Sequence, residues 1–318
     1  MAEPSVAAVV IGRNEGARLL SCLDSLAGQV DRIVYVDSDS TDGSVDAARA
    51  WGAEVVELDP GMPFTAARAR NAGAAHLGGA AAFVQFVDGD CSVDPGWVAT
   101  GLAVLQAQAD VAVVCGRRRE RHPDASVYNR LIDKEWDTPP GEARACGGDA
   151  LMRLAAVDAV GRFTDWIIAG EEPELCVRLR AAGWRILRLD SEMTLHDASM
   201  TRLSQFWARA RRAGYAFALG AALHGAPPER HYVRELRRAL IWGAGLPAAA
   251  GALALAAPPW ALLVLMLYPL QILRLWARDG DLAHAGLLTL AKVPEALGAL
   301  SYGYDRLTGR AGRIIEYK

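Results

Sequence analysis

The chain has 318 residues, enough for one large catalytic domain and a smaller appendage. Its formal net charge of -3 argues against a nucleic-acid-binding protein, because such proteins are usually basic overall. The five cysteines (Cys22, Cys91, Cys115, Cys146 and Cys176) are scattered and form no Cys-x-x-Cys pair. They indicate reduced thiols of a cytoplasmic protein rather than a disulfide or zinc framework. The N-terminus has no basic region ahead of an apolar stretch, so no signal peptide is expected.

Strand-like and helix-like patterns alternate along the N-terminal half. Apolar runs at 6–11, 32–36, 54–58 and 82–87 predict four strands, and helices are predicted after residue 14 and over 65–76. Strands separated by helices of this length predict an α/β fold with a mostly parallel sheet and right-handed crossovers.

A polar cluster follows three of these strands. The clusters are Arg13-Asn14-Glu15, residues 37–42 and residues 88–90. Ligands of such sheets bind beyond the carboxyl ends of the strands, so we expect all three clusters to meet at one edge. Three unrelated solvated turns would be a poor explanation of this arrangement.

The third cluster, Asp88-Gly89-Asp90, indicates a metal site. Two aspartates at the end of a buried strand offer hard oxygen ligands, which suit Mg²⁺ or Mn²⁺ and, through the ion, a diphosphate. Asp90 is the expected metal ligand, with Asp88 assisting at the metal or at a ribose. The alternatives are that only one of them touches the ligand, or that the motif is a solvated turn.

Further motifs stand in the order and spacing of a known family. They include residues 9–15, 36–43, 69–73, 87–90, 146–153 and 170–175, and Leu195-His196. With these segments the chain resembles, over roughly residues 5–215, the family 2 glycosyltransferases. These are inverting enzymes with the GT-A fold, in which helices cover both faces of a Rossmann-like sheet, and they use nucleotide-sugar donors.

The resemblance implies a catalytic base at Glu171-Glu172. Relatives commonly have Glu-Asp there, so the second position, Glu172, is the favoured base and Glu171 the alternative; capping of the helix that follows is the non-catalytic interpretation. His196 matches a histidine that joins the metal or the diphosphate in some GT-A enzymes. A purely structural histidine would explain it as well.

The resemblance also implies a donor pocket. Asp39 could instead cap the next helix, Arg68 and Arg70 could lie on a solvated helix face, and Arg211 and Arg212 could face anionic lipid. The expected donor-binding residues are Arg13, Asn14, Glu15, Asp37, Asp39, Arg68, Arg70, Asp88, Gly148, Asp149, Arg211 and Arg212.

Composition changes after about residue 200. Residues 239–273 carry no charge, are interrupted by Pro258-Pro259, and are flanked by Arg237-Arg238 and by Arg274 and Arg278. This pattern predicts a membrane hairpin or helices lying in the interface, with a buried helical pair as the soluble alternative. We therefore expect a GT-A catalytic domain over 1–222 and a helical membrane-associated region over 223–318.

The sequence thus predicts an inverting glycosyltransferase of cell-surface polysaccharide biosynthesis, on the cytoplasmic face of a bacterial inner membrane. Its expected cofactor is Mn²⁺ or Mg²⁺, and its expected partners are a nucleotide-sugar, UDP-linked by preference, and a polyprenyl-linked saccharide. Nucleic acid is not an expected partner, and the sequence does not determine the oligomeric state. The alternatives are a nucleotidyltransferase-like enzyme and a catalytically inactive membrane scaffold.

Overall fold

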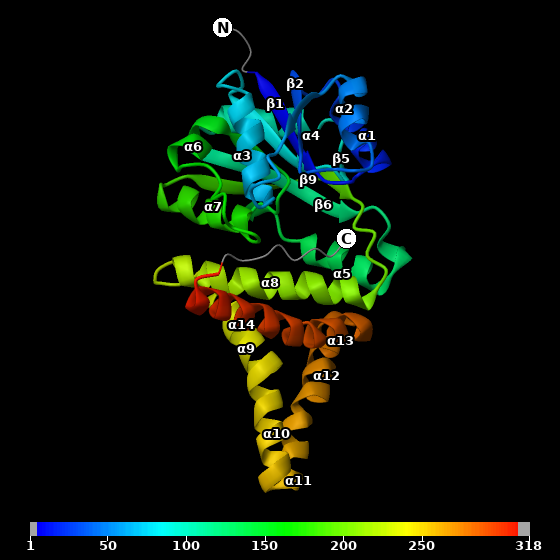
Figure 1. The fold of residues 1–318 in the computed structure, drawn as a ribbon, viewed down its shortest axis with the longest axis vertical. Coiled ribbons are helices and arrows are strands. Elements are labelled where there is room, and N and C mark those ends of the chain that lie inside the picture. The colour runs from blue at the N-terminus through cyan, green and yellow to red at the C-terminus, as the bar shows by residue number, and fades with distance from the viewer. Residues whose placement is uncertain (1–4, 311–318) are drawn as a thin grey trace. The chain divides into compact units, whose positions relative to one another are not determined.

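The computed structural model describes residues 5–310 (Figure 1). Contacts divide them into a first unit of residues 5–124 and 132–199 and a second unit of residues 125–131 and 200–310. The division lies near residue 199; the expected functional boundary at residue 222 stays a prediction.

The first unit is built on one mixed sheet with the order β3-β2-β1-β4-β8-β6-β9-β5, and β7 pairs with β9. The strands are β1 (Val6–Gly12), β2 (Arg32–Asp37), β3 (Glu54–Glu57), β4 (Phe83–Asp88), β5 (Cys91–Val93), β6 (Val111–Glu120), β7 (Gly141–Glu142), β8 (Ala150–Arg153) and β9 (Arg185–His196). The predicted parallel pairing of the four apolar runs is confirmed. The sequence analysis did not foresee that β8 would lie antiparallel between β4 and β6.

Helices cover both faces of this sheet (Figure 1). They are α1 (Ala17–Leu26), α2 (Ser44–Trp51), α3 (Ala66–His76), α4 (Trp97–Ala107), α6 (Leu154–Ala159) and α7 (Glu171–Ala181). Thr65 caps α3 by accepting the Arg68 backbone N–H at 3.0 Å. Gly73 lets this helix approach the sheet closely, because a Cβ there would collide with Val9.

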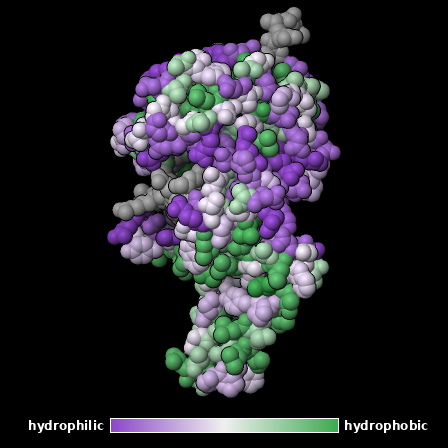
Figure 2. Space-filling view, turned by 90° about the vertical axis from the view of Figure 1, so that its right-hand side faces the viewer, coloured by the Kyte–Doolittle hydropathy of each residue, from purple (hydrophilic) through white to green (hydrophobic). Residues whose placement is uncertain are grey.

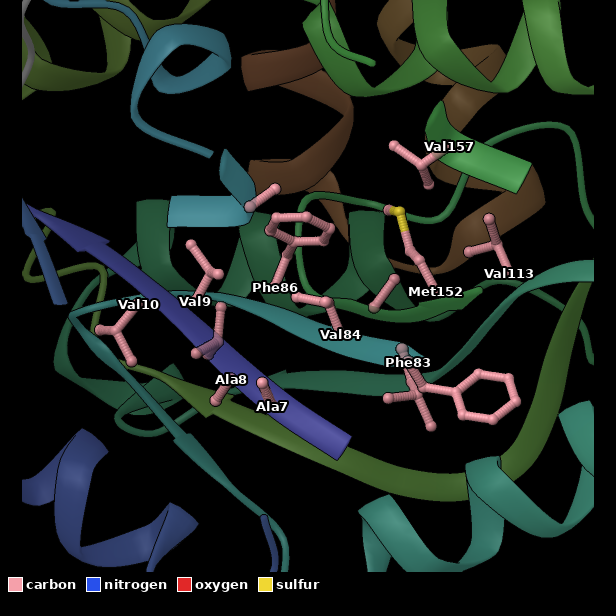
Figure 3. Packing of buried hydrophobic residues seen from close by; sticks show 14 of the residues in the cluster. Ala7, Ala8, Val9, Val10, Phe83, Val84, Phe86, Val113, Met152 and Val157 are labelled. Carbon is pink, nitrogen blue, oxygen red and sulfur yellow. The ribbon is translucent and has the colours of Figure 1, made fainter. Parts of the chain in front are cut away.

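The core of the first unit lies between the sheet and these helices. Figure 3 shows Phe86 of β4 between Val9 of β1 and Met152 of β8. The Phe86 ring also meets the edge of Phe163, with ring centres 5.3 Å apart. On the opposite face, buried Gln85 accepts a hydrogen bond from Trp97 Nε1 at 2.8 Å, so its amide oxygen does not lose hydrogen bonding on burial.

The second unit is helical. A short 3₁₀ helix η1 (Pro123–Ala125) and helix α5 (Val127–Trp136) lie where the chain passes between the units. The remaining elements are α8 (Leu203–His224), α9 (Val233–Leu240), the π-helical turn η2 (Ile241–Gly245), α10 (Leu246–Ala256), α11 (Pro258–Leu265), α12 (Leu267–Asp279), α13 (Leu282–Leu290) and α14 (Lys292–Thr308).

Helices α8 and α14 pack at very short range. A Cβ on Gly214 would collide with the Glu295 backbone, and a Cβ on Gly298 would collide with the Arg211 backbone. Small residues at a helix crossing allow such an approach, so each of these glycines is required where the two helices touch.

Two apolar stretches extend from this helical pair. Residues 233–256 and 258–279 are long and apolar enough to cross a membrane. In the most apolar 18-residue segment of each, only 11% and 6%, respectively, is buried. Their exposed side chains include Leu255, Trp260 and Leu262. Figure 2 shows hydrophobic side chains covering the surface of α10 and α11.

Candidate active site

The three polar loops predicted to meet do lie together at the carboxyl edge of the sheet. Asn14 joins the first loop to the second, because its backbone N–H donates to Ser40 Oγ and its Oδ1 accepts from the Thr41 N–H. The Gly89 N–H joins the third loop to the first by donating to Ile11 O at 2.8 Å. This part of the sequence analysis is confirmed.

Asp88 lies between two buried arginines. Arg70 Nη2 is 2.9 Å from its Oδ1, and Arg118 Nη2 is 3.4 Å from its Oδ2. Arg70 also reaches Glu171 at 2.7 Å, and Arg118 reaches Asp149 at 3.1 Å. Buried charges are stable only when paired in this way, so the network fixes both guanidinium groups at the end of β4.

Asp90 faces His196 on the other side of this strand end. Its Oδ2 lies 3.2 Å from His196 Nε2, and His196 Nδ1 lies 3.3 Å from Glu120 Oε2. Burial, together with the Arg118 charge, lowers the pKa of His196 below its usual value, which favours the neutral imidazole at pH 7. A neutral ring has one N–H. If the N–H is on Nδ1 and donates a hydrogen bond to Glu120, the lone pair of Nε2 faces the Asp90 carboxylate.

The N-terminus of α7 brings the two candidate bases to the same edge in different surroundings. Glu171 is held by Arg70. Glu172 is 4% exposed and turns towards the loop before β8, where its Oε1 accepts the Cys146 backbone N–H at 2.5 Å. Glu174 pairs with Arg178 at 2.7 Å and is buried, so it is not the helix-surface residue that its position suggests.

Several expected donor-binding residues are engaged with the protein. Asp37 is 2% exposed and accepts from the Tyr35 hydroxyl and the Ser40 N–H. Asp149 is fully buried and accepts from the Asp88 N–H and the Thr194 hydroxyl, so it faces the strand end and not the outside. Arg68 donates to three carbonyl oxygens of the loop 59–63, directed away from the Asp88 network that Arg70 joins.

The other expected residues are more open. Arg13 is exposed and lies over the Phe64 ring at 5.7 Å, while Glu15 pairs with Arg18 at 2.7 Å. Asp39 is exposed with a positive φ, and it is Asp42 that accepts from Ser44 at the start of α2.

Gly148 lies beside the arginine pair: a Cβ there would be 3.5 Å from both guanidinium groups. Arg211 and Arg212 belong to α8 in the second unit, where Arg211 donates to Ser301 at 3.1 Å. Their expected contact with a donor diphosphate stays a prediction.

Three residues of this site were not predicted from the sequence: Arg118, Glu120 and Trp136. Trp136 lies edge-on to His196, with ring centres 4.8 Å apart, and Arg118 stands 4.5 Å above the Trp136 ring. The available signal was the run Arg117-Arg118-Arg119-Glu120 at the end of an apolar strand. Alternate side chains of a strand face opposite sides, so two of the four charges had to point inward.

Comparison with known proteins places this geometry in a family. The model of glycosyl transferase family 2 matches residues 7–157. An uncharacterized glycosyltransferase of Mycobacterium tuberculosis is 31% identical over 211 residues, covering 60% of this chain and 85% of that protein. Glycosyltransferase AglE of Haloferax volcanii is 24% identical over 210 residues, covering 61% of this chain and 67% of that protein.

Solved structures show the same fold. A mannosyltransferase from Pyrobaculum calidifontis, in complex with GDP-Man and Mn²⁺, matches with a TM-score of 0.66 at 20% identity, over 95% of this chain and 88% of that chain. Glucosyl-3-phosphoglycerate synthase from Mycobacterium tuberculosis was solved in complex with Mn²⁺, UDP and glucosyl-3-phosphoglycerate. It matches with a TM-score of 0.52 at 20% identity, over 71% of this chain and 82% of that chain. The predicted GT-A architecture is therefore confirmed.

Proposed function

This chain belongs to glycosyltransferase family 2, and on that basis we propose that it transfers a sugar from a nucleotide-sugar to an acceptor hydroxyl with inversion at the anomeric carbon. The observation that carries the proposal is the convergence of Asp90 and His196 with the Asp88 arginine network at one sheet edge. It provides oxygen and imidazole ligands for a divalent ion beside two fixed guanidinium groups, and the ion would supply the net positive charge that a sugar diphosphate requires.

The donor set fits Mn²⁺. Two ligands each about 2.1 Å from an octahedral ion, at a right angle, are about 3 Å apart, and the Asp90 and His196 atoms are 3.2 Å apart. Glu120 behind His196 completes the carboxylate–histidine arrangement that orients metal-binding imidazoles. When bound there, the ion would stabilise the charge that develops on the leaving nucleoside diphosphate. The structurally similar enzymes named above were solved with Mn²⁺ and with GDP-Man or UDP, which supports a nucleotide-sugar donor without selecting the nucleobase.

The protein's side chains would provide the other two functions, which are to hold the donor and to remove a proton from the acceptor. Arg70 and Arg118, held by Asp88, place fixed guanidinium N–H groups next to the Gly147-Gly148 loop. Glu172 would take the proton from the acceptor hydroxyl as it attacks. We favour it over Glu171, because the Glu171 carboxylate is already engaged in an ion pair with Arg70.

We extend the proposal to a lipid-linked acceptor, with a polyprenyl-linked saccharide of a cell-surface polysaccharide pathway as the intended class. It is supported by the two apolar stretches over 233–279, of which few residues are buried, as a membrane-embedded pair would require. Full-length protein should then sediment with membranes and require detergent for extraction. Protein that stays in the high-speed supernatant without detergent would move the acceptor towards a water-soluble molecule.

The decisive experiment is a donor panel with purified full-length protein in detergent. We expect Mn²⁺-dependent release of nucleoside diphosphate from one nucleotide-sugar, lost in Asp90→Asn and retained in the control Asp94→Asn, whose exposed side chain lies just beyond β5. Undiminished activity in EDTA would overturn the metal assignment. No turnover of any nucleotide-sugar, with acceptor present, would favour the inactive scaffold.

A further inference from the structure

Two thiols and a carboxylate gather beneath the loop that precedes β8. Glu172 Oε1 lies 2.9 Å from Cys146 Sγ and 3.0 Å from Cys176 Sγ, and the two sulfurs are 3.8 Å apart. Cys146 and Glu172 are 4% exposed and Cys176 is fully buried. The cluster nevertheless lies just under the surface, because the neighbours of Cys146 along the chain, Ala145 and Gly147, are exposed.

The spacing matches the ligand triangle of a thiophilic ion. Sulfurs bound at about 2.3 Å in a tetrahedral site are about 3.8 Å apart, the separation of the two thiols here. The same geometry sets sulfur and a carboxylate oxygen about 3.5 Å apart, so the carboxylate would withdraw by about half an ångström. A side-chain torsion of Glu172 can supply that movement.

We propose that Cys146, Cys176 and Glu172 form a binding site for a thiophilic divalent cation such as Zn²⁺. Two thiolates and one carboxylate leave the fourth tetrahedral position to water. The Asp90–His196 site has one thiol within reach, Cys91, whereas this site has two, so this site is the more selective for thiophilic ions.

Cation binding exchanges protons for metal. Burial raises the pKa of Cys176 to about 11, and that of Cys146 well above its usual value. Without the cation, both thiols are therefore protonated and can donate their S–H groups to Glu172 Oε1. An incoming dication forms two metal–sulfur bonds and one metal–oxygen bond, and the two thiol protons leave to solvent.

The consequence for transfer rests on the proposed role of Glu172 as base. A carboxylate bound to a dication is a much weaker base, because the metal charge disfavours addition of a proton. Zn²⁺ at this site would therefore block the chemical step while donor and Mn²⁺ still bind, and a chelator that removes Zn²⁺ but leaves Mn²⁺ in excess would restore activity.

Binding is tested without any assay of activity. Full-length protein saturated with Mn²⁺ is titrated with Cd²⁺, and the ultraviolet cadmium–thiolate absorption is followed. We expect one equivalent per chain in the wild type, and loss of that absorption in Cys146→Ser and in Cys176→Ser. Their folding is checked by thermal unfolding and by nucleotide binding.

Two controls separate this site from other thiols. Cys115→Ser removes a buried thiol on β6 and should leave the titration unchanged. Cys91, which lies 3.5 Å from Asp90 Oδ1, is the competing thiol, and Cys91→Ser should also leave it unchanged. Loss of the absorption in Cys91→Ser, or its survival in both Cys146→Ser and Cys176→Ser, would overturn the proposed site.

Activity supplies the second arm. Zn²⁺ added in the presence of excess Mn²⁺ should inhibit wild-type transfer and leave the residual transfer of Cys176→Ser unchanged. Cadmium binding at the cluster without inhibition by Zn²⁺ would confirm the site and reject Glu172 as the base. The two ideas therefore fail by different measurements.

Discussion

Replacement of Glu120 by glutamine tests how the candidate metal site is oriented. The Glu120 side chain is fully buried, and its Oε2 faces His196 Nδ1 at 3.3 Å and accepts the Ala198 backbone N–H at 3.1 Å. An amide has nearly the same shape but only one acceptor oxygen. Its NH₂ group must therefore oppose either the His122 N–H, which Glu120 Oε1 accepts at 3.2 Å, or the Ala198 N–H and the protonated Nδ1 of His196, which both face Oε2.

Loss of a carboxylate behind a metal-binding histidine typically costs 10–100-fold in metal affinity. That factor corresponds to about 1.4–2.8 kcal/mol, at 1.4 kcal/mol for each factor of ten. We expect Glu120→Gln to weaken Mn²⁺ binding by this factor, measured from the free-Mn²⁺ electron paramagnetic resonance signal with nucleoside diphosphate present. Glu192→Gln is the matched control, because Glu192 also belongs to this part of the sheet and its side chain is 48% exposed beside Arg117. Wild-type Mn²⁺ affinity in Glu120→Gln would refute the orientation of His196 by Glu120.

Three further predictions follow from other parts of the structure. Glu172→Gln should lower turnover by about 10²–10⁴-fold with donor affinity retained, in steady-state assays; a crippling effect of Glu171→Gln alone would reverse the assignment. Glu54→Gln should destabilise the fold by about 0.5–1 kcal/mol at pH 7 in urea unfolding, since the Arg32 hydrogen bonds and His76 lower the pKa of Glu54 to about 2. Because that pKa is depressed in the folded state, the difference should hold above about pH 4.5 and shrink as pH falls towards 2; a pH-independent difference would contradict it. Replacing the three arginines of α9 with glutamine should reduce binding to anionic vesicles by about 1 kcal/mol each and leave nucleotide binding unchanged.

The sequence was informative wherever local patterns determine the structure. Apolar runs that end in polar clusters located β1, β2 and β4 and the edge at which their loops meet, because pairing of parallel strands fixes where strand ends lie. The direction of β8 had no such signal. It depends on the residues that β4 and β6 present as neighbours, and these lie far apart in the chain.

The site residues that were missed owe their role to contacts between distant segments. Glu120 comes within reach of His196 because β6 and β9 pair in parallel, at a separation of 76 residues. In the sequence, Cys146 and Cys176 are 30 residues apart and nothing relates them. The fold places the loop before β8 against α7, and this brings the two thiols together. Burial of the Asp149 carboxylate was likewise invisible, because Thr194 and Arg118 come from other strands.

The packing of α14 along α8 has a consequence for synthesis of the chain. The last helix begins at Lys292, 68 residues after α8 ends at His224 (292 minus 224). At roughly 5–20 residues per second, the ribosome needs about 3–14 s to make the intervening segment. During that interval the face of α8 that carries Gly214 cannot yet pack against α14. The apolar stretches over 233–279 leave the ribosome before α14 does. A nascent chain paused in this interval is therefore the form of the protein most exposed to aggregation, and early delivery to a lipid surface would protect it.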